Sequence, residues 1–239
     1  MSPSAGHEWR RKIEKIFLKG LGLSFDGHKY FDDLDFEIPI GKVMIIEGGS
    51  GSGKSILMKA IAALITPSKG DVYYNDISLE EITREEFDLF RLNMAFGFDN
   101  GGLLSNRTIR DNIMLPLSYH GLQSHAEAEH MIKEFELTPF EHARPFSLSL
   151  AIKKMAGIAR SLAIEPQVLF LDEPSLGLSS AQTDCIVKHV KSWKEKDPSR
   201  TLICASSDKY FNLLFEHDHY LIEKHSLRKL DPPALRPTG

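Results

Sequence analysis

The segment that most constrains the fold is a glycine-rich run, GGSGSGKS, at residues 48–55. The apolar residues Val43–Ile46 before it predict a buried strand, and the apolar spacing of Leu57–Ile65 after it predicts a helix. The run fits the pattern G-x-x-x-x-G-K-[ST], which is informative when it lies between a strand and a helix N-terminus. Because both flanking patterns are present, the sequence predicts an α/β fold that contains a phosphate-binding loop.

Each residue type in this loop has a use in binding a nucleotide. Glycines reach positive φ values and bring backbone N–H groups close to phosphate oxygens, and a helix N-terminus adds unpaired donors. Lys54 is predicted to contact the β- and γ-phosphates, and the Ser55 hydroxyl to bind Mg²⁺. The predicted ATP contacts in the loop are Gly48, Gly49, Ser50, Gly51, Ser52, Gly53, Lys54 and Ser55. The alternative is a flexible Gly/Ser turn with no ligand.

A second set of polar residues follows a buried strand later in the chain. The apolar residues Val168–Leu171 are followed directly by Asp172 and Glu173. Beside a phosphate site, Asp172 is predicted to bind Mg²⁺, either directly or through water. Glu173 is predicted to be catalytic, because its carboxylate can orient or deprotonate the attacking water. The alternative is a strand end whose acidic residues are simply solvated.

Composition narrows the possible partners and the cell compartment. The chain has 239 residues, of which 42% are hydrophobic, so it is long enough for one or two domains with a buried core. Its net charge of −4 provides no basic field, and we expect no nucleic-acid partner. Cys185 and Cys204 lack metal-ligand spacing, which favours buried free thiols in a reducing cytoplasm. Residues 1–11 lack the apolar core of a signal peptide, and no run approaches the ~18 apolar residues of a membrane span.

Strand-like and helix-like segments alternate along the chain, which is typical of an α/β sheet. Strands are predicted at residues 17–25, 35–38, 43–46, 70–76, 167–171 and 200–205. The continuous apolar character of the last two indicates a parallel sheet that is covered on both faces. Residues 80–144 show mostly helical spacing, with a capping box predicted at Thr108–Asp111 and a helix at 126–136.

These segments predict a single domain over residues 15–239. The nucleotide-binding core is expected at residues 15–87 and 164–225, interrupted by a helical subdomain at 88–163. The remaining residues, 1–14 and 226–239, are expected to be terminal extensions, and the prolines after residue 231 favour an extended tail.

The motifs around the second acidic pair resemble those of the ATP-binding cassette (ABC) family. Asp172–Leu178, with the sequence DEPSLGL, is similar to the family's DEPTSGLD, and Leu162–Pro166 matches the usual lead into the preceding strand. The resemblance extends over residues 17–223. It implies a P-loop NTPase fold with a mainly parallel sheet, an antiparallel β subdomain and a helical subdomain.

Two finer similarities accompany this resemblance. Phe25 stands where the family places an aromatic ring that stacks on adenine, and the alternative is an ordinary core phenylalanine. Residues 98–104 and 108–117 are similar to the ATPases of Mce-associated lipid importers. This second similarity implies phospholipid, or another apolar molecule, as cargo.

Four positions depart from the family's pattern and make its motifs degenerate. Asp99 aligns with the Q-loop glutamine, residues 148–152 (LSLAI) with the signature LSGGQ, Ser179 with the D-loop aspartate, and Ser207 with the switch histidine. Ser149 keeps a hydroxyl for a γ-phosphate, but the glycines that follow it in the family are replaced. Asp99 and Ser207 remain predicted nucleotide contacts. Since losing one preorganised donor costs about 10²–10³ in rate, the departures predict a cassette that binds ATP and hydrolyses it slowly.

The resemblance implies the cytoplasmic ATP-binding subunit of an ABC transporter, peripheral on the inner face of the cell membrane, which uses ATP and Mg²⁺. It implies two partners, a membrane-spanning permease contacted near residues 99–117 and a second ABC ATPase subunit. The sequence leaves open whether that second subunit is identical. The alternative is a nucleotide-dependent regulatory or scaffolding protein with little ATPase turnover. A P-loop kinase fits poorly with residues 174–178 and with the helical insertion.

Overall fold

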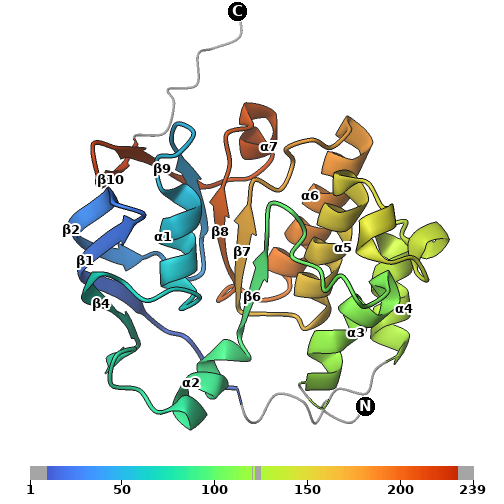
Figure 1. The fold of residues 1–239 in the computed structure, drawn as a ribbon, viewed down its shortest axis with the longest axis horizontal. Helices are drawn as coiled ribbons and strands as arrows, with labels where there is room; N and C mark the ends of the chain where they lie inside the picture. Colours follow the sequence, from blue (N-terminus) through green and yellow to red (C-terminus); the bar gives the residue numbers. More distant parts are fainter. Residues whose placement is uncertain (1–9, 120, 122–124, 231–239) are drawn as a thin grey trace, which may run out of the picture.

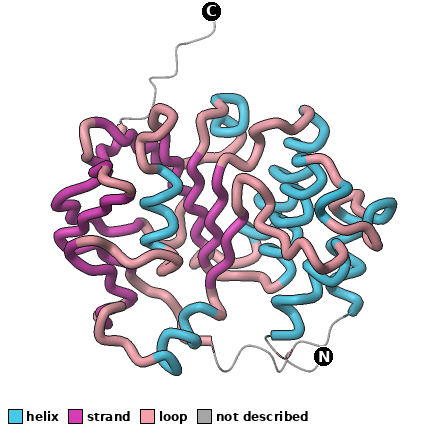
Figure 2. The backbone as a smooth tube through the Cα atoms, viewed as in Figure 1, coloured by secondary structure: helices cyan, strands magenta, loops and turns pink. Residues whose placement is uncertain are grey.

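Two sheets carry the fold, as Figure 1 and Figure 2 show. The structure is a computed structural model that describes residues 10–119, 121 and 125–230. The larger sheet has six strands in the order β10-β9-β3-β8-β7-β6. Adjacent strands in it are parallel, except that β9 and β10 pair antiparallel. Its strands are β3 (Val43–Glu47), β6 (Met94–Gly97), β7 (Val168–Asp172), β8 (Thr201–Ala205), β9 (Asp218–Glu223) and β10 (Ser226–Lys229).

The smaller sheet is antiparallel, with its four strands in the order β2-β1-β4-β5. Its strands are β1 (Ile16–Phe25), β2 (His28–Ile38), β4 (Lys69–Tyr74) and β5 (Ile77–Ser78). Asp26 and Gly27 join β1 to β2, with φ values of 48° and 77°. An Asp-Gly pair favours the tight hairpin turn that needs two positive φ values. The predicted α/β class, with an antiparallel β subdomain beside a mainly parallel sheet, is confirmed.

Helices cover both faces of the larger sheet. They are α1 (Lys54–Ile61), α2 (Arg84–Arg91), α3 (Ile109–Tyr119), α4 (His125–Glu134), α5 (Leu150–Ala163), α6 (Ser180–Glu195) and α7 (Lys209–Leu213). Alternate residues of β3 divide between two cores, since side chains alternate along a strand. Val43 and Ile45 pack in the core with α3–α6, whereas Met44 and Ile46 pack in the core with α1 and the antiparallel sheet. Within the described ranges, no helix has the length and apolar character that a membrane crossing requires.

The predicted capping box at the start of α3 is confirmed. The N–H of Thr108 donates to Oδ2 of Asp111 at 3.2 Å, and the N–H of Asp111 donates to Oγ1 of Thr108 at 3.1 Å. Each side chain therefore satisfies a backbone donor that the first turn of a helix leaves unpaired.

Three expectations about element boundaries are wrong. The helical pattern at residues 80–144 contains β6, which pairs with β7 in the larger sheet. The predicted extension 226–239 contains β10, which pairs with β9. The first helix begins at Lys54 and ends at Ile61 instead of spanning 57–65, because Ala63 has a φ of 53° and leaves the helical conformation.

The predicted N-terminal extension is also partly packed against the core. Ile13 is fully buried, and its N–H donates to Oε1 of Gln167 at 2.8 Å. Residues 1–9 and 231–239, including the predicted extended tail, lie outside the described residues. The division into a nucleotide-binding core and a helical subdomain stays a prediction.

The two cysteines lie in different environments. Cys204 on β8 is fully buried, and burial raises the pKa of its thiol well above the ordinary value. Cys185 on α6 is only partly buried, and its Sγ lies 3.5 Å from the carbonyl oxygen of Glu134. Both are free thiols, as predicted, but only Cys204 is fully buried.

Candidate functional site

The carboxyl ends of four neighbouring parallel strands bring the predicted site residues to one edge of the larger sheet. In space these strands follow the order β3-β8-β7-β6. β3 ends directly before Gly48, and β7 ends at Asp172. β8 ends directly before Ser206, and β6 ends two residues before Asp99. Ligands of open α/β sheets bind beyond the carboxyl ends of the strands, so this edge is the expected place for a site.

The loop between β3 and α1 ends in an uncapped helix N-terminus. Gly53 is the N-cap of α1 and offers no side-chain acceptor to the first N–H groups of the helix. Those donors are therefore open to an anion. Gly53 has a φ of 97°, and a Cβ there would lie 2.9 Å from Cδ1 of Tyr30. The loop conformation thus requires glycine at this position and packs against the β2 residue Tyr30.

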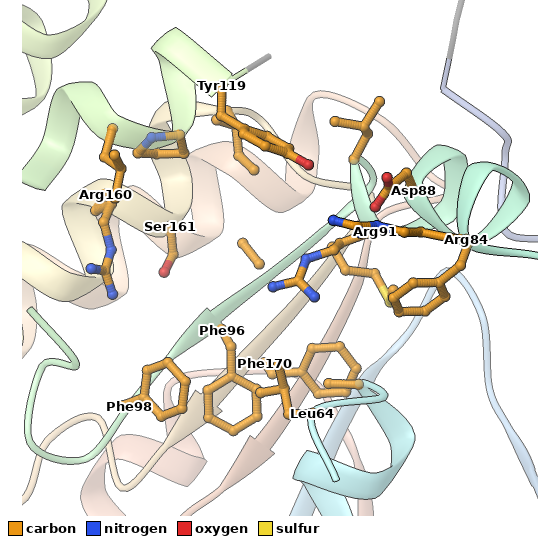
Figure 3. Close-up of a pocket in the computed structure, with 18 residues that line it drawn as sticks. Leu64, Arg84, Asp88, Arg91, Phe96, Phe98, Tyr119, Arg160, Ser161 and Phe170 are labelled. Carbon is orange, nitrogen blue, oxygen red and sulfur yellow. The ribbon is translucent and has the colours of Figure 1, made fainter. Parts of the chain in front are cut away.

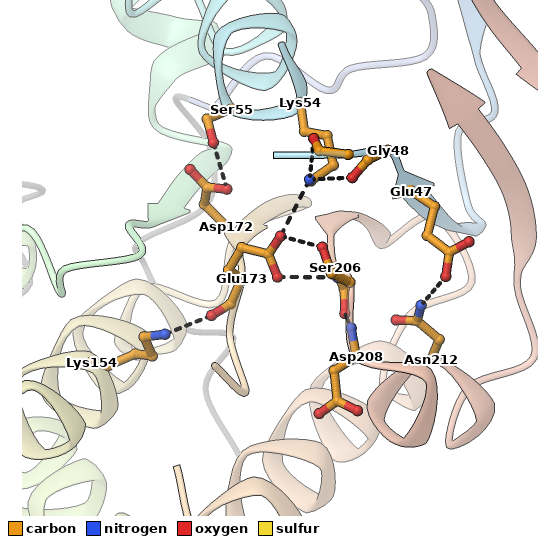
Figure 4. Close-up of polar contacts among 12 residues, drawn as sticks. Glu47, Gly48, Lys54, Ser55, Lys154, Asp172, Glu173, Ser206, Asp208 and Asn212 are labelled. Carbon is orange, nitrogen blue, oxygen red and sulfur yellow. Dashed lines mark hydrogen bonds and ion pairs between the residues drawn. The ribbon is translucent and has the colours of Figure 1, made fainter. Parts of the chain in front are cut away.

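The side chain of Lys54 folds back over the loop, as Figure 4 shows. Its Nζ donates to the carbonyl oxygen of Gly48 at 2.7 Å and lies 3.4 Å from that of Gly49. The residue is only 8% exposed, and Nζ also lies 3.5 Å from Oε1 of Glu173. The structure therefore places the buried amino group of Lys54 over the phosphate-binding loop.

Ser55 and Asp172 form a pair of oxygen ligands at the start of α1 and the end of β7. The Ser55 hydroxyl donates to Oδ1 of Asp172 at 2.9 Å. Asp172 is 2% exposed, and burial raises the pKa of its carboxyl, whereas the hydrogen bond from Ser55 lowers it. Hydroxyl and carboxylate oxygens suit Mg²⁺, which usually takes one or two protein ligands together with substrate phosphates. In the part of the chain that the structure describes, no cluster of three or more His, Cys, Asp or Glu would hold a metal by itself.

Both carboxylate oxygens of Glu173 accept hydrogen bonds. The Ser207 hydroxyl donates to Oε1 at 2.8 Å, and the Ser207 N–H donates to Oε2 at 3.1 Å. Glu173 itself has a φ of 43°, which is uncommon for a residue with a side chain, and its N–H donates to the carbonyl of Ala205 at 2.8 Å. The structure therefore brings Lys54, Glu173 and Ser207 together, as their predicted roles require.

Lys154 lies in the same neighbourhood and was not predicted from the sequence. This α5 residue is 1% exposed, and its Nζ donates to the carbonyl oxygens of Glu173 at 2.6 Å and Leu176 at 2.7 Å. The available signal was a lysine directly before the small and apolar residues 155–159. That signal is weak, because the sequence does not say which side of α5 faces the sheet.

Asp99 lies close enough to act on both Asp172 and Lys154 electrostatically. Burial raises the pKa of the Asp172 carboxyl, and the charge of Asp99 adds to that rise; burial lowers the pKa of Lys154, and the charge of Asp99 opposes that fall. The loop that carries Asp99 is held against α5, since Arg160 Nη1 donates to the carbonyl oxygen of Gly102 at 2.9 Å. A Cβ on Gly157 of α5 would lie 2.3 Å from the carbonyl oxygen of the same loop at Gly101.

A second polar cluster, also absent from the sequence predictions, stands directly before the loop. Oε2 of Glu47 lies 3.1 Å from Nε2 of His219, and Nδ2 of Asn212 lies 3.5 Å from Oε1 of Glu47. The side chain of His219 is 20% exposed. These contacts hold the end of β3 and take no part in the contacts of Lys54.

Residues 31–176 match the family model described as "ABC transporter". The chain belongs to the ABC transporter family. It is 34% identical over 183 residues to the "Methionine import ATP-binding protein MetN" of Legionella pneumophila (strain Lens), covering 75% of this chain and 54% of that protein. It is 31% identical over 174 residues to the "Probable ribonucleotide transport ATP-binding protein mkl" of Mycobacterium leprae (strain TN), covering 70% of this chain and 50% of that protein. The chain thus spans about half the length of the curated relatives it matches.

Solved structures of ABC transporter cassettes share the fold. The dimeric structure of MJ0796, a bacterial ABC transporter cassette, matches with a TM-score of 0.79 at 24% identity and covers 91% of this chain and 99% of that one. A structure of its post-hydrolysis state, bound to ADP and Pi, has a TM-score of 0.80 at the same 24% identity and the same coverage. At this identity the likeness extends to the fold alone.

Two of the predicted ABC nucleotide contacts lie apart from the contacts around Lys54. Ser149 is the N-cap of α5, and its hydroxyl accepts a hydrogen bond from the N–H of Ile152 at 3.3 Å. Phe25 ends β1 and is 54% exposed. Ser179, at the D-loop position, begins α6 through a capping box with Gln182. The predicted nucleotide roles of Ser149 and Phe25 stay predictions.

Proposed function

We propose that the chain is the ATP-binding subunit of an ABC transporter and couples ATP binding and hydrolysis to movement of a membrane-spanning partner. The observation that carries the proposal is the convergence of Lys54, Ser55, Asp172 and Glu173 at one edge of the larger sheet. Phosphoryl transfer to water requires a phosphate cradle, a metal-binding pair and a group that positions water. The match to the ABC transporter family model supports the same conclusion.

Each of these residues has a defined task with MgATP. The backbone N–H groups of residues 48–55 hold the phosphates, and Lys54 contacts the β- and γ-phosphates. Ser55 and Asp172 would hold Mg²⁺, which would supply positive charge at the phosphate oxygens. Phe25, with its ring exposed at the end of β1, stacks on adenine. Glu173 orients the attacking water and accepts its proton.

The proposed second cassette covers the surface at the start of α5. Phe146 and Leu150, on either side of Ser149, are 79% and 49% exposed. Leu176 is 64% exposed and lies beside the same helix, because Lys154 donates to its carbonyl. Exposed apolar residues gathered in this way are usual where a partner binds. A homodimer would carry the LSLAI sequence in both composite ATP sites, whereas a heterodimer would carry it in one.

The proposed permease contact is a groove of ≈ 730 Å³, shown in Figure 3. Its apolar and aromatic lining includes Phe96, Phe98, Leu115, Tyr119 and Phe170, and its arginines are Arg84, Arg91 and Arg160. An apolar floor with arginines around it suits an amphipathic helix that carries acidic side chains. The groove also overlaps residues 99–117, for which the sequence resemblance implies the permease contact.

We propose a phospholipid or another apolar molecule as cargo, and a location on the inner face of the cell membrane through the permease. The support is the similarity of residues 98–104 and 108–117 to the ATPases of Mce-associated lipid importers. The relatives named above are described as proteins of methionine import and of ribonucleotide transport. A transport assay should therefore offer all three classes of cargo side by side.

A second candidate function is a nucleotide-dependent regulatory or scaffolding protein. The observation that favours it is that Ser207, the residue at the position of the family's switch histidine, is hydrogen-bonded to both carboxylate oxygens of Glu173. The altered residues at Asp99, 148–152 and Ser179 act in the same direction. Both functions require MgATP binding, and they differ in turnover.

Steady-state ATP hydrolysis by the chain alone and with its permease tests the proposed function. We expect hydrolysis to rise at least about tenfold with the permease, because a second cassette closing on the ATP adds donors, each worth about 10²–10³ in rate. Phosphate release in detergent or nanodiscs is the measurement. Tight MgATP binding with no hydrolysis in either state would exclude the transporter motor and favour the scaffold.

Replacing Ser207 by His is expected to raise the rate of hydrolysis at least about tenfold, a part of the ~10²–10³ that one preorganised donor supplies. An imidazole reaches further than a hydroxyl and can donate to the γ-phosphate, and the substitution also removes the hydroxyl that holds Oε1 of Glu173. Ser207→Ala is the matched control, since it removes the hydroxyl bond to Oε1 of Glu173 without adding an imidazole. An unchanged rate in Ser207→His would refute the assignment of position 207 as the switch residue.

A further inference from the structure

Glu47, Asn212 and His219 bring a carboxylate, an amide and an imidazole together beside the phosphate-binding loop, and none of the ATP-site tasks assigned above uses them. Oε2 of Glu47 lies 3.1 Å from Nε2 of His219, and Oε1 of Glu47 lies 3.5 Å from Nδ2 of Asn212. Figure 4 shows the Asn212 amide facing the Glu47 carboxylate. The three residues come from β3, α7 and β9, so only the folded chain assembles them.

The hydrogen bonding of this cluster is incomplete. Asn212 is only 5% exposed. Among the residues that the structure describes, Oδ1 of Asn212 and Nε2 of His219 are buried atoms without a hydrogen-bond partner. Leaving a buried polar atom unpaired is costly, so most such atoms in folded proteins have a protein group, a water or an ion as partner. Both atoms belong to side chains that face the carboxylate of Glu47, and one bound cation would satisfy both.

A half-turn of the Asn212 amide completes a set of three metal ligands. The rotation exchanges Nδ2 and Oδ1, which have nearly the same shape, and turns Oδ1 toward the carboxylate of Glu47. Two oxygens facing each other with no hydrogen between them repel, unless a cation lies between them. The ligands would then be a carboxylate oxygen, an amide oxygen and the Nε2 nitrogen of His219.

The spacing of these atoms fits a tetrahedral metal such as Zn²⁺. Bonds of about 2.0–2.2 Å at tetrahedral angles place neighbouring ligand atoms about 3.3–3.6 Å apart. The separations in the structure are 3.1 and 3.5 Å, so a metal needs only small movements of the side chains. Three protein ligands leave the fourth position for water. An imidazole nitrogen suits zinc and its first-row neighbours, whereas Mg²⁺ prefers six oxygen ligands.

We propose that Glu47, Asn212 and His219 form a binding site for a divalent transition-metal ion such as Zn²⁺. The metal joins the end of β3 to α7 and β9, directly before Gly48, the first residue of the phosphate-binding loop. The site is separate from the proposed Mg²⁺ pair, whose protein ligands are both oxygens. It does not depend on the binding of MgATP, so its tests use no nucleotide and stand whether or not the proposed function holds.

Calorimetric titration of the tag-free chain with Zn²⁺ measures the site. Asn212→Leu keeps the side-chain volume and removes the amide, and His219→Gln removes the imidazole. Each is expected to weaken zinc binding at least about tenfold, because even the outer-shell partners of metal ligands contribute about 10–100-fold. Mg²⁺ at the same concentration is expected to give no binding heat. Zinc affinity that is unchanged in both variants would overturn the proposal.

His142→Gln is the matched control for the loss of an imidazole. Nε2 of His142 lies 3.5 Å from Oε1 of Glu141, so it also faces a carboxylate, but its side chain is 81% exposed. Zinc affinity is expected to change less than about twofold in this variant, because removing a solvated surface imidazole leaves the proposed ligands untouched. A loss equal to that in His219→Gln would show that zinc binds surface histidines in general and would refute the site.

Asn212→Asp separates a metal site from a cluster that is merely hydrogen-bonded, because the two make opposite predictions. A second carboxylate beside that of Glu47 repels it without a metal, so this variant is expected to unfold at lower urea than the wild type. With a metal the added charge attracts, and zinc affinity is expected to rise at least about tenfold. Zinc at a hundred times its Kd should then lower the unfolding equilibrium constant about a hundredfold. If zinc left the urea unfolding of Asn212→Asp unchanged, the site would be refuted.

Cobalt spectroscopy distinguishes this site from one that uses a cysteine. Co²⁺ replaces Zn²⁺ in tetrahedral sites and absorbs visible light there, and a thiolate ligand adds a strong charge-transfer band in the near ultraviolet. The proposed ligands contain no sulfur, so we expect the visible bands without the thiolate band, and their loss in His219→Gln. A thiolate band that persists in His219→Gln would place the metal at the partly buried Cys185 and overturn the proposal.

Discussion

Replacing Lys54 by Ala is expected to weaken MgATP binding by at least about a hundredfold. Nζ of Lys54 is buried over the phosphate-binding loop, 2.7 Å from the carbonyl of Gly48. It is therefore already positioned for phosphate oxygens and loses little side-chain entropy when they bind. Charge-assisted hydrogen bonds contribute about 1.5–3 kcal/mol each, and two such bonds correspond to a hundredfold or more in affinity. Isothermal calorimetry of the purified chain with MgATP is the measurement.

The control for this substitution is Lys69→Ala. The side chain of Lys69 is 59% exposed and lies 3.6 Å from Oδ1 of Asp33 in a surface ion pair. A surface pair of this kind contributes about 0–1 kcal/mol to stability, and it is unrelated to the loop, so affinity is expected to change less than about twofold. If Lys54→Ala bound MgATP as tightly as Lys69→Ala does, the nucleotide would have to bind elsewhere and the proposed function would be wrong.

The parts of the site that the sequence predicts are those set by short local patterns. Residues 48–55 need a strand before them and a helix after them, and both are visible in a few neighbouring residues. Asp172 and Glu173 follow four apolar residues, which form the buried strand β7. Thr108 and Asp111 mark the start of α3 because a capping box is confined to four consecutive residues.

The parts that the sequence does not predict depend on contacts between distant segments. β6 has four residues between α2 and a loop, too few to show a strand period, and its pairing with β7 makes it a strand. Lys154 is buried because α5 turns that side toward the turn after β7, which its own residues do not dictate. The hydrogen bond from Ser207 to Glu173 joins residues 34 positions apart and forms only in the folded chain.

The catalytic role of Glu173 can be tested directly by substitution. Replacing Glu173 by Gln is expected to lower the rate of ATP hydrolysis at least about a hundredfold, the loss that follows when a general base is removed. MgATP affinity is expected to stay within about threefold, because the amide has the size of the carboxylate and the phosphate donors are untouched. Single-turnover hydrolysis with radiolabelled ATP measures the rate separately from the affinity.

Glu195→Gln is the matched control, since Glu195 lies exposed at the end of α6 and should leave both quantities unchanged. Retained hydrolysis in Glu173→Gln would mean that another group activates the water and that Glu173 is only a structural acceptor for Ser207 and Lys54. A lost rate with retained affinity would instead identify the carboxylate as the base. The hydrogen bonds from Ser207 leave a further lone pair on each carboxylate oxygen, so the carboxylate can accept a proton from water while Ser207 stays bound.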